Sequence, residues 1–177
     1  MEQNVFLDEV ELKRLMVQGR LLSEYEQPIY QKVIDGRKGL TLLDVGCNNG
    51  WKTKERFSDK NFKKIIGIDC LDLLVEQARK QFGNEVLSFY ACDVATEDFA
   101  EKLQQIMQKE NIPAFDIIHC SFMLMHTKEQ EEILRRLKAF LAPGGKLIAI
   151  EPDDTTSYMN PDPDGIYREF LQVLSAD

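Results

Sequence analysis

The fold of this 177-residue chain is decided by one stretch, LLDVGCNNG, at residues 42–50. An apolar run there ends in Asp44 and passes into a turn made of glycines, asparagines and Cys47. Because Gly46 and Gly50 carry no side chain, the backbone of this turn can bend sharply and approach a ligand closely. A strand that ends in such a turn before a helix is typical of a parallel α/β sheet.

Four further apolar runs follow the first one. They occupy residues 65–69 (IIGID), 86–91 (VLSFYA), 115–120 (FDIIHC) and 146–151 (KLIAIE), with amphipathic helical patterns between them. Because the apolarity within these runs is continuous, we expect strands that are covered on both faces, as in a parallel sheet. The order of the elements predicts an open, doubly wound α/β sheet with right-handed crossovers.

The whole chain is expected to form one domain, because the sequence contains no internal repeat and no sign of a second domain. Residues 5–35 predict one or two helices, interrupted near Gly19 and Pro28, that cover the sheet edge or cap a ligand site. Pro143-Gly144-Gly145 predicts a turn before the last strand. The expected divisions are a helical cap at 1–36, a core at 40–151, and a loop followed by a terminal helix at 152–177.

The composition disfavours several classes of partner. Lysine and arginine total 22 against 30 acidic residues, for a net charge of −8, so a nucleic-acid backbone or an anionic membrane is an unfavourable general partner. No apolar run approaches the roughly 20 residues of a membrane span, and the N-terminus lacks a signal-peptide layout, so we expect a cytoplasmic protein. The cysteines form no CxxC pair and no cluster with histidine, which predicts reduced thiols and no metal site: Cys47, Cys70, Cys92 and Cys120.

Acidic residues recur where the first three predicted strands end, namely Asp44, Asp69 and Asp93. Ligands of open α/β sheets bind outside the carboxyl ends of the strands. A carboxylate after the second strand can accept both hydroxyls of a ribose, and one after the third can accept from the exocyclic amine of adenine. Asp44 would repel a pyrophosphate and attract a cationic ligand.

Five motifs, taken together, resemble those of class I S-adenosylmethionine-dependent methyltransferases. They are LLDVGCNNG, IIGID, ACDV, FDIIHCSFMLMH and LKAFLAPGGKLIAIEP, in the order of the family and over residues 40–151. The resemblance implies a Rossmann-like sheet of five parallel strands in the order 3-2-1-4-5, with S-adenosylmethionine as cofactor and S-adenosylhomocysteine as product. The family usually adds two more strands, so we expect a shortened chain or an edge covered by the terminal helix or by a neighbouring chain, as in a homodimer.

The resemblance also implies which residues line the methionine part of the cofactor. These are Asp44, Gly46, Cys47 and Gly50, with Asp44 near the cofactor's ammonium group. Asn48 belongs to the same turn but stands where the family commonly has glycine. Asparagine tolerates left-handed backbone angles better than most residues, so the turn can keep its shape.

Other implied contacts lie along the nucleoside. Asp69 would hold the ribose hydroxyls with Cys70 beside it, and Asp93 and Val94 would contact the adenine. The remaining implied contacts are Ser121 and Phe122 beneath the cofactor, and Arg20 or Tyr25 at its carboxylate.

The chain has two histidines, and neither is an obvious catalyst. His119 falls within an apolar strand and is expected to be a hydrogen-bonded core residue. His126, in the loop after the fourth strand, is the candidate general base, although an ordinary loop residue is the alternative. A base is needed only where the acceptor atom is protonated at neutral pH, so the catalytic residues stay open.

The expected function is methyl transfer from S-adenosylmethionine to an unidentified small molecule. A module that binds the cofactor or a partner without turnover is one alternative. A nicotinamide-dependent oxidoreductase is another, since Asp69 lies where a ribose-binding acid would stand. It is disfavoured because residues 46–50 do not give G-x-G-x-x-G and because Asp44 lies too near the pyrophosphate site.

Overall fold

The structure is a computed structural model that describes residues 8–58 and 62–153, together with Gly165 and Glu169. In this described part, no helix is both long enough and apolar enough to cross a membrane. The terminal helix expected near the end of the chain lies outside the described residues.

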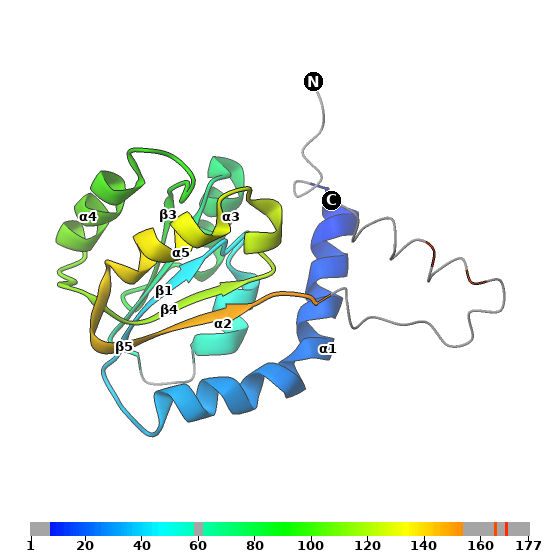
Figure 1. Ribbon diagram of the computed structural model, residues 1–177, viewed down its shortest axis with the longest axis horizontal. Helices are drawn as coiled ribbons and strands as arrows, with labels where there is room; N and C mark the ends of the chain where they lie inside the picture. Colours follow the sequence, from blue (N-terminus) through cyan, green and yellow to red (C-terminus); the bar gives the residue numbers. More distant parts are fainter. Residues whose placement is uncertain (1–7, 59–61, 154–164, 166–168, 170–177) are drawn as a thin grey trace.

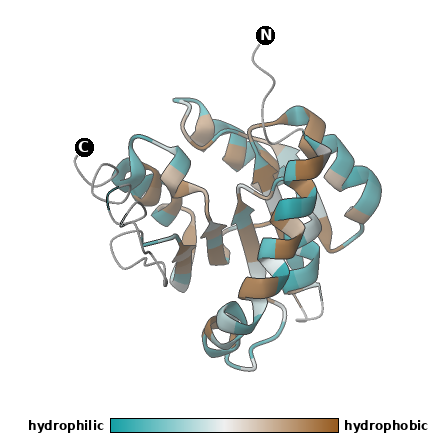
Figure 2. Ribbon diagram, turned by 90° about the vertical axis from the view of Figure 1, so that its right-hand side faces the viewer, coloured by the Kyte–Doolittle hydropathy of each residue, from teal (hydrophilic) through white to brown (hydrophobic). Residues whose placement is uncertain are grey.

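Helices and strands alternate along the chain after a long first helix (Figure 1). The strands are short and predominantly apolar, whereas the helices are banded with polar and apolar residues (Figure 2). The elements are α1 (Glu9–Ile34), β1 (Thr41–Val45), α2 (Trp51–Phe57), β2 (Lys64–Asp69), α3 (Asp72–Phe82), β3 (Leu87–Ala91), α4 (Phe99–Lys109), β4 (Phe115–Ser121), the 3-10 turn η2 (Leu124–His126), α5 (Gln130–Lys138) and β5 (Leu141–Ile150).

The strands form one parallel sheet in the order β3-β2-β1-β4-β5. This is the predicted fold and the predicted strand order. The order reverses between β1 and β4, so the carboxyl ends of these two strands flank the crevice in which ligands of such sheets bind. The register aligns Val45 of β1 with Ile68 of β2 and with Cys120 of β4, which brings the ends of the three strands to the same edge.

Both faces of the sheet are covered, which explains the continuous apolarity of the strands. Leu43 and Val45 of β1 pack in a core that includes residues of α4 and α5. Leu42 of the same strand belongs to the opposite core, together with Tyr30 of α1 and Phe57 of α2.

The N-terminal region is a single 26-residue helix, so the expected interruptions at Gly19 and Pro28 are wrong. Pro28 lies inside α1, where it lacks the N–H for an intrahelical bond. The helix nevertheless continues through a bend (Figure 1). A Cβ added at Gly19 would lie 3.1 Å from the Cε of Lys52, so glycine permits the close approach of α1 to α2.

The last strand begins earlier than expected. Pro143-Gly144-Gly145 lies within β5 rather than in a turn before it, and the pairing with β4 shifts register between Phe115 and Ile117. Gly144 has a φ of +76°, as a bulge residue can require. Within the described residues β5 pairs with β4 alone, and proline is tolerated on an edge of this kind.

Candidate active site

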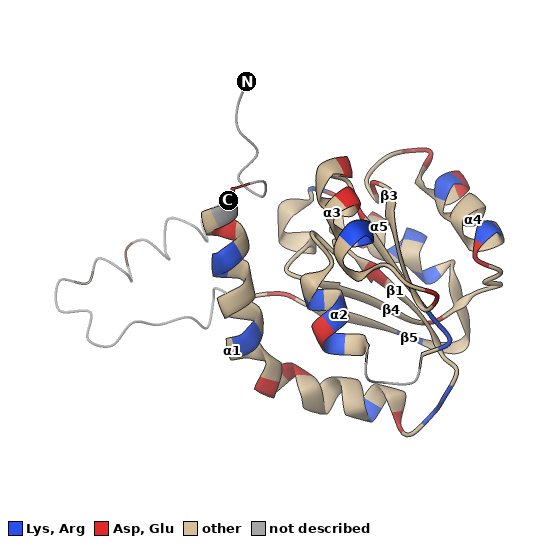
Figure 3. Ribbon diagram, turned by 180° about the vertical axis from the view of Figure 1, so that it is seen from behind, with Lys and Arg blue, Asp and Glu red and all other residues tan. Residues whose placement is uncertain are grey.

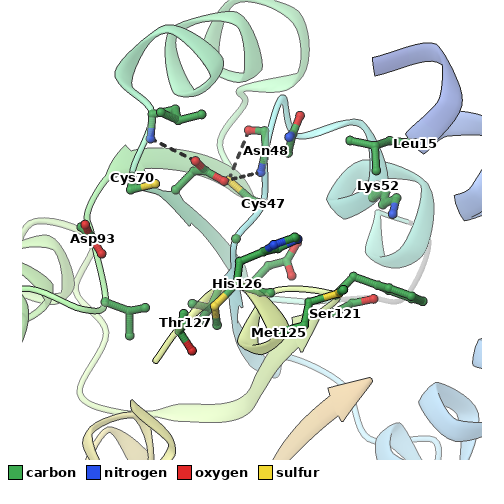
Figure 4. A pocket seen from close by; sticks show the side chains of 18 of the residues that line it. Leu15, Cys47, Asn48, Lys52, Cys70, Asp93, Ser121, Met125, His126 and Thr127 are labelled. Carbon is green, nitrogen blue, oxygen red and sulfur yellow. Dashed lines mark hydrogen bonds between the residues drawn. The ribbon is translucent and has the colours of Figure 1, made fainter. Parts of the chain in front are cut away.

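A cavity of about 1010 Å³ opens at the carboxyl ends of the strands, where the sequence predicted a site (Figure 4). Its walls come from α1, from the turn after β1, from the tips of β2 and β3, and from the loop after β4. Ten of the predicted site residues line it: Asp44, Gly46, Cys47, Asn48, Asp69, Cys70, Asp93, Val94, Ser121 and Phe122.

The turn after β1 forms the floor of the cavity. The amides of Gly46 and Cys47 both donate to the carbonyl of Ile68, which ties the turn to β2. Gly46 has a φ of +74°, and a Cβ there would lie 2.8 Å from the Cγ of Met123. Asn48 has a φ of +52°, so asparagine takes the left-handed conformation in which the family commonly has glycine.

Gly50 ends the turn but is not among the residues that line the cavity. Its φ is +76°, and a Cβ there would lie 2.7 Å from the ring of Phe89 and 2.8 Å from Ala78. Close packing against β3 and α3 therefore requires this glycine.

The carboxylate of Asp69 is held in place by backbone amides. Oδ1 accepts from the amide of Leu71 at 3.0 Å, and Oδ2 accepts from the amide of Asn48 at 2.8 Å. Burial raises the pKa of Asp69 above its ordinary value, although these two bonds oppose the shift. Each oxygen keeps a lone pair that can accept a hydroxyl from a ligand.

The tip of β3 supplies the next acidic group along the same wall. Asp93 is half-buried, and its Oδ1 accepts from the amide of Ala95 at 2.9 Å. Val94 beside it is buried, and Cys70 of the neighbouring tip lies between Asp93 and Asn48 in Figure 4. This end of the cavity therefore offers an apolar surface next to a carboxylate.

The thiols of the site are free, as predicted, and they are neutral groups. Burial raises the pKa of Cys70 to about 11 and raises that of Cys47 well above its ordinary value. Among the described residues no cluster of three or more His, Cys, Asp or Glu side chains could hold a metal ion.

The loop after β4 closes the opposite wall. Phe122 has a φ of +54°, and η2 follows it. The carboxylate of Glu151 accepts from the amides of Met123, Leu124 and Met125, at 3.0, 2.9 and 3.3 Å. Sequence reasoning missed this role, although the acid at the end of the fifth apolar run was its signal.

His126 lies in this wall, at the end of η2. Its side chain is exposed and is drawn among the cavity residues near Met125 and Thr127 (Figure 4). The structure therefore brings the candidate general base to the cavity.

Asp44 lies at the start of a chain of buried polar groups rather than at a free surface. It is 3% exposed, and its oxygens accept from His119 Nδ1 at 2.7 Å and from the hydroxyl of Thr53. Burial raises the pKa of Asp44, but His119 and Thr53 outweigh it and hold the pKa below the ordinary value. Asp44 is therefore an anion at neutral pH.

The same chain of contacts continues to α1. His119 is fully buried, as expected for a core histidine, and its Nε2 lies 3.0 Å from the hydroxyl of Tyr30. Since an ionised Asp44 can only accept, His119 donates to it from Nδ1. The Tyr30 hydroxyl donates its own proton to Glu26 Oε2 at 3.2 Å. Glu26, one turn before Tyr30, accepts two bonds from the guanidinium of Arg56 at 2.6 and 2.8 Å.

Arg56 completes this group, since it also donates to the hydroxyl of Ser121 at 3.2 Å. We call the set the buried polar network, and it joins α1, α2, β1 and β4 beneath the cavity. Its members are Glu26, Tyr30, Asp44, Thr53, Arg56, His119 and Ser121.

Two residues that were expected at the cofactor carboxylate do not line the cavity. The guanidinium of Arg20 lies over the ring of Trp51, 5.6 Å from its centroid, and Tyr25 is 76% exposed. The residues of α1 that do line the cavity come from earlier turns: Glu11, Leu12, Arg14, Leu15, Met16 and Gln18.

Lys52 is one of the cavity side chains of α2 that sequence reasoning overlooked, along with Trp51 and Arg56. It is half-buried in the cavity wall, with Nζ 5.8 Å from the centroid of the Phe122 ring. Burial and the nearby charge of Arg56 lower the pKa of Lys52 to about 8. Its signal was a lysine in the first turn of the helix that follows the glycine turn.

The fold and the cavity together define a class of protein. A parallel sheet with the order 3-2-1-4-5, a glycine turn after β1 and carboxylates at the tips of β2 and β3 is the arrangement of an α/β domain that binds a nucleoside-containing cofactor. The family described as methyltransferase domain matches residues 43–147. The chain belongs to this family of S-adenosylmethionine-dependent class I methyltransferases.

Individual relatives act on different kinds of acceptor. The chain is 31% identical over 129 residues to a tRNA U34 carboxymethyltransferase of Pseudoalteromonas translucida, covering 70% of this chain and 36% of that protein. It is 28% identical over 124 residues to a ubiquinone biosynthesis O-methyltransferase of Coxiella burnetii, covering 68% of this chain and 48% of that protein. The chain thus spans less than half the length of either relative.

A solved structure shares the fold. The amino pentose methyltransferase CalS10 of Micromonospora echinaspora, bound to S-adenosylmethionine, superimposes with a TM-score of 0.62 at 19% identity. The match covers 90% of this chain and 62% of that one.

Proposed function

We propose that the cavity binds S-adenosylmethionine and that the domain transfers its methyl group to a small-molecule acceptor. The adenine lies beside Asp93 and Val94, and the ribose hydroxyls donate to Asp69. The observation that carries this proposal is the geometry of Asp69, whose two oxygens are each held by one backbone amide and each keep a lone pair for a hydroxyl.

The main task of the protein in this reaction is to align the acceptor atom with the methyl group of the cofactor. The acceptor atom attacks the methyl carbon, the carbon–sulfur bond breaks, and its electron pair stays on sulfur, which leaves S-adenosylhomocysteine. Since the sulfonium is already reactive, holding the two partners in line supplies most of the effect, which can reach about 7–11 kcal/mol. Where the acceptor carries a proton at neutral pH, His126 at the cavity wall is the candidate general base that removes it.

A small acceptor fits the walls of the cavity better than a polyanion does. Apolar side chains of α1 and of the loop after β4 line it, among them Leu12, Leu15 and Met125. The chain carries a net charge of −8, and basic and acidic positions are intermixed along α1 and α2 (Figure 3). A uniformly positive surface would favour binding to a nucleic-acid backbone, and neither helix presents one.

Calorimetric titration tests the cofactor. We expect heat of binding with S-adenosylmethionine and with S-adenosylhomocysteine, and none with reduced nicotinamide cofactor. Binding of the nicotinamide cofactor alone would replace this proposal with the oxidoreductase alternative, and heat from neither ligand would remove both.

A labelled-methyl assay tests the transfer itself. Amine, phenol and carboxylate acceptors are compared with an RNA pool under the same conditions. Label in a small acceptor supports the proposal, and label in RNA alone would overturn the small-molecule part. Tight cofactor binding with no transfer to any of these would favour the non-catalytic binding module.

A further inference from the structure

The end of the cavity that receives the amino-acid part of the cofactor lacks the partner that was expected there. Both oxygens of Asp44 already accept a proton donor from the protein, and the residue is 3% exposed. Asp44 can therefore attract a cationic ligand through its negative charge, but its carboxylate oxygens have little surface that a ligand could contact. The ammonium and the carboxylate of a bound methionine group must find other partners, since charged groups that are taken out of water without partners are costly.

Lys52 is an available cation at this end. Leu15 and Lys52 lie at the side of the cavity away from Asp93 (Figure 4). Of the other cations that line this end, Arg14 is paired with Glu11 and Arg56 is paired with Glu26. Within the described residues, no carboxylate lies within 4.0 Å of the Lys52 ammonium, which instead lies over the ring of Phe122.

Gln18 of α1 supplies the complementary group. Its Oε1 is a buried side-chain atom without a hydrogen-bond partner among the described residues, and the residue lines the same cavity. Buried polar atoms are rarely left unsatisfied, so an unpaired acceptor in the wall of a ligand site points to a donor on the ligand. Lys52 and Gln18 lie on facing helices, because the neighbouring Gly19 packs directly against Lys52.

We propose that Lys52 and Gln18 together bind the amino-acid group of the cofactor, with its carboxylate on the Lys52 ammonium and its ammonium on Gln18 Oε1. This inference rests on the proposed function, and it assigns a task that was expected of Asp44, Arg20 or Tyr25. The pair has one donor and one acceptor for the two charges of a zwitterion. Asp44, as a buried anion below the turn, adds charge that favours the cofactor's ammonium and sulfonium without touching them.

Two ligands that differ only at the amino-acid end test the assignment. S-adenosylhomocysteine carries the zwitterion, whereas 5′-methylthioadenosine has the same nucleoside and thioether but ends in a methyl group. In Lys52→Met we expect the Kd for S-adenosylhomocysteine to rise roughly 10- to 100-fold, as for the loss of a charged hydrogen bond. The Kd for 5′-methylthioadenosine should stay within about twofold.

Lys54→Met is the matched control, because Lys54 is an exposed lysine of the same helix that pairs with Glu55. It should leave both dissociation constants unchanged. The inference is wrong if Lys52→Met leaves S-adenosylhomocysteine binding intact, or if it weakens both ligands equally. If the unaltered protein binds neither ligand, the proposed function fails instead.

Gln18→Leu gives a second readout that does not depend on the charge of Lys52. It should weaken S-adenosylhomocysteine several-fold and leave 5′-methylthioadenosine unaffected. Because it removes a buried unpaired oxygen, the ligand-free protein should be at least as stable to urea as the unaltered one. A loss of stability in the free protein would mean that Gln18 has a structural partner, which would overturn its role.

Discussion

The two ends of the cavity are held in place by different kinds of contact. At the end where we propose that the nucleoside binds (the nucleoside end), Asp69 and Asp93 are fixed by backbone amides. One amide for each carboxylate comes from only two residues further along the chain. At the end proposed for the amino-acid group (the amino-acid end), Glu26 of α1 fixes Arg56 and His119 of β4 fixes Asp44, at separations of 30 and 75 residues. The first end is therefore built by local turns, and the second depends on how α1 docks onto the sheet.

This difference has an energetic consequence. Backbone amides would hold the nucleoside-end carboxylates even if neighbouring side chains changed, so changes there should act on ligand binding. The buried polar network links side chains of four elements by hydrogen bonds and an ion pair. Because a buried charge that loses its partner is costly, substitutions there should lower the stability of the fold. Substitutions at one end should therefore change ligand binding, and substitutions at the other should change stability.

The largest expected effect is on folding, from the removal of the buried partner of Arg56. Glu26→Gln leaves the guanidinium buried without a counter-charge, which typically costs about 3–5 kcal/mol. Urea unfolding should show this loss as a lower midpoint. Glu24→Gln, at an exposed position of the same helix, is the control and should be nearly neutral. Equal midpoints for the two variants would show that the pair does not hold α1 in place.

The next effect belongs to the nucleoside end and should appear in binding. Asp69→Asn keeps the shape of the side chain, but it loses the charge and replaces one of the two accepting oxygens with a donor nitrogen. We expect a loss of about 1.5–3 kcal/mol in binding S-adenosylhomocysteine, or roughly a 10- to 150-fold rise in Kd by calorimetry. Asp72→Asn, at an exposed position in the first turn of α3, should bind normally. Unchanged binding by Asp69→Asn would remove the ribose assignment.

The sequence predicted that the carboxylates of Asp69 and Asp93 meet at one cavity because the signals for this are local. A carboxylate directly after a strand is visible in the chain, and the parallel register brings successive strand ends to one edge. The strand order also followed, since the resemblance and the alternation of apolar runs pointed to the same sheet. Asn48 was identified as a residue that tolerates the left-handed conformation, and it has a φ of +52°.

The amino-acid end could not be predicted in the same way. Whether Asp44 faces a ligand or a histidine depends on the packing of His119, which lies 75 residues away. Arg20 and Tyr25 were expected to contact the cofactor. Which residues of α1 face the cavity depends on α1 being one continuous helix, whereas a proline such as Pro28 predicts a break. Long-range packing, rather than local propensity, decided these positions.

A smaller effect on folding is expected from the middle of the buried polar network. Tyr30→Phe removes the hydroxyl that reaches both His119 and Glu26, at a residue that is 1% exposed. We expect a loss of about 1–2 kcal/mol in the free energy of unfolding, with little change in the binding of 5′-methylthioadenosine. Tyr25→Phe is the exposed control on the same helix. A binding defect in Tyr25→Phe would instead support the original expectation that this tyrosine touches the cofactor.

The smallest effect is a pH dependence with opposite signs at the two ends. Asp44 has a lowered pKa, so its ionised form stabilises the fold above its ordinary pKa, and this stability is lost as the pH falls through the lower value. Burial raises the pKa of Asp69, so its ionisation costs stability as the pH rises from the ordinary pKa to the raised value. Asp69→Asn removes only the second contribution, since Asp44 is common to both proteins.

The free energy of unfolding of Asp69→Asn, relative to the unaltered protein, should therefore rise as the pH increases from about 4 to 7. Urea unfolding at several values in this range measures the difference directly. A relative stability of Asp69→Asn that falls with rising pH would mean that the two backbone amides outweigh burial at Asp69, so that its charge stabilises the fold as that of Asp44 does.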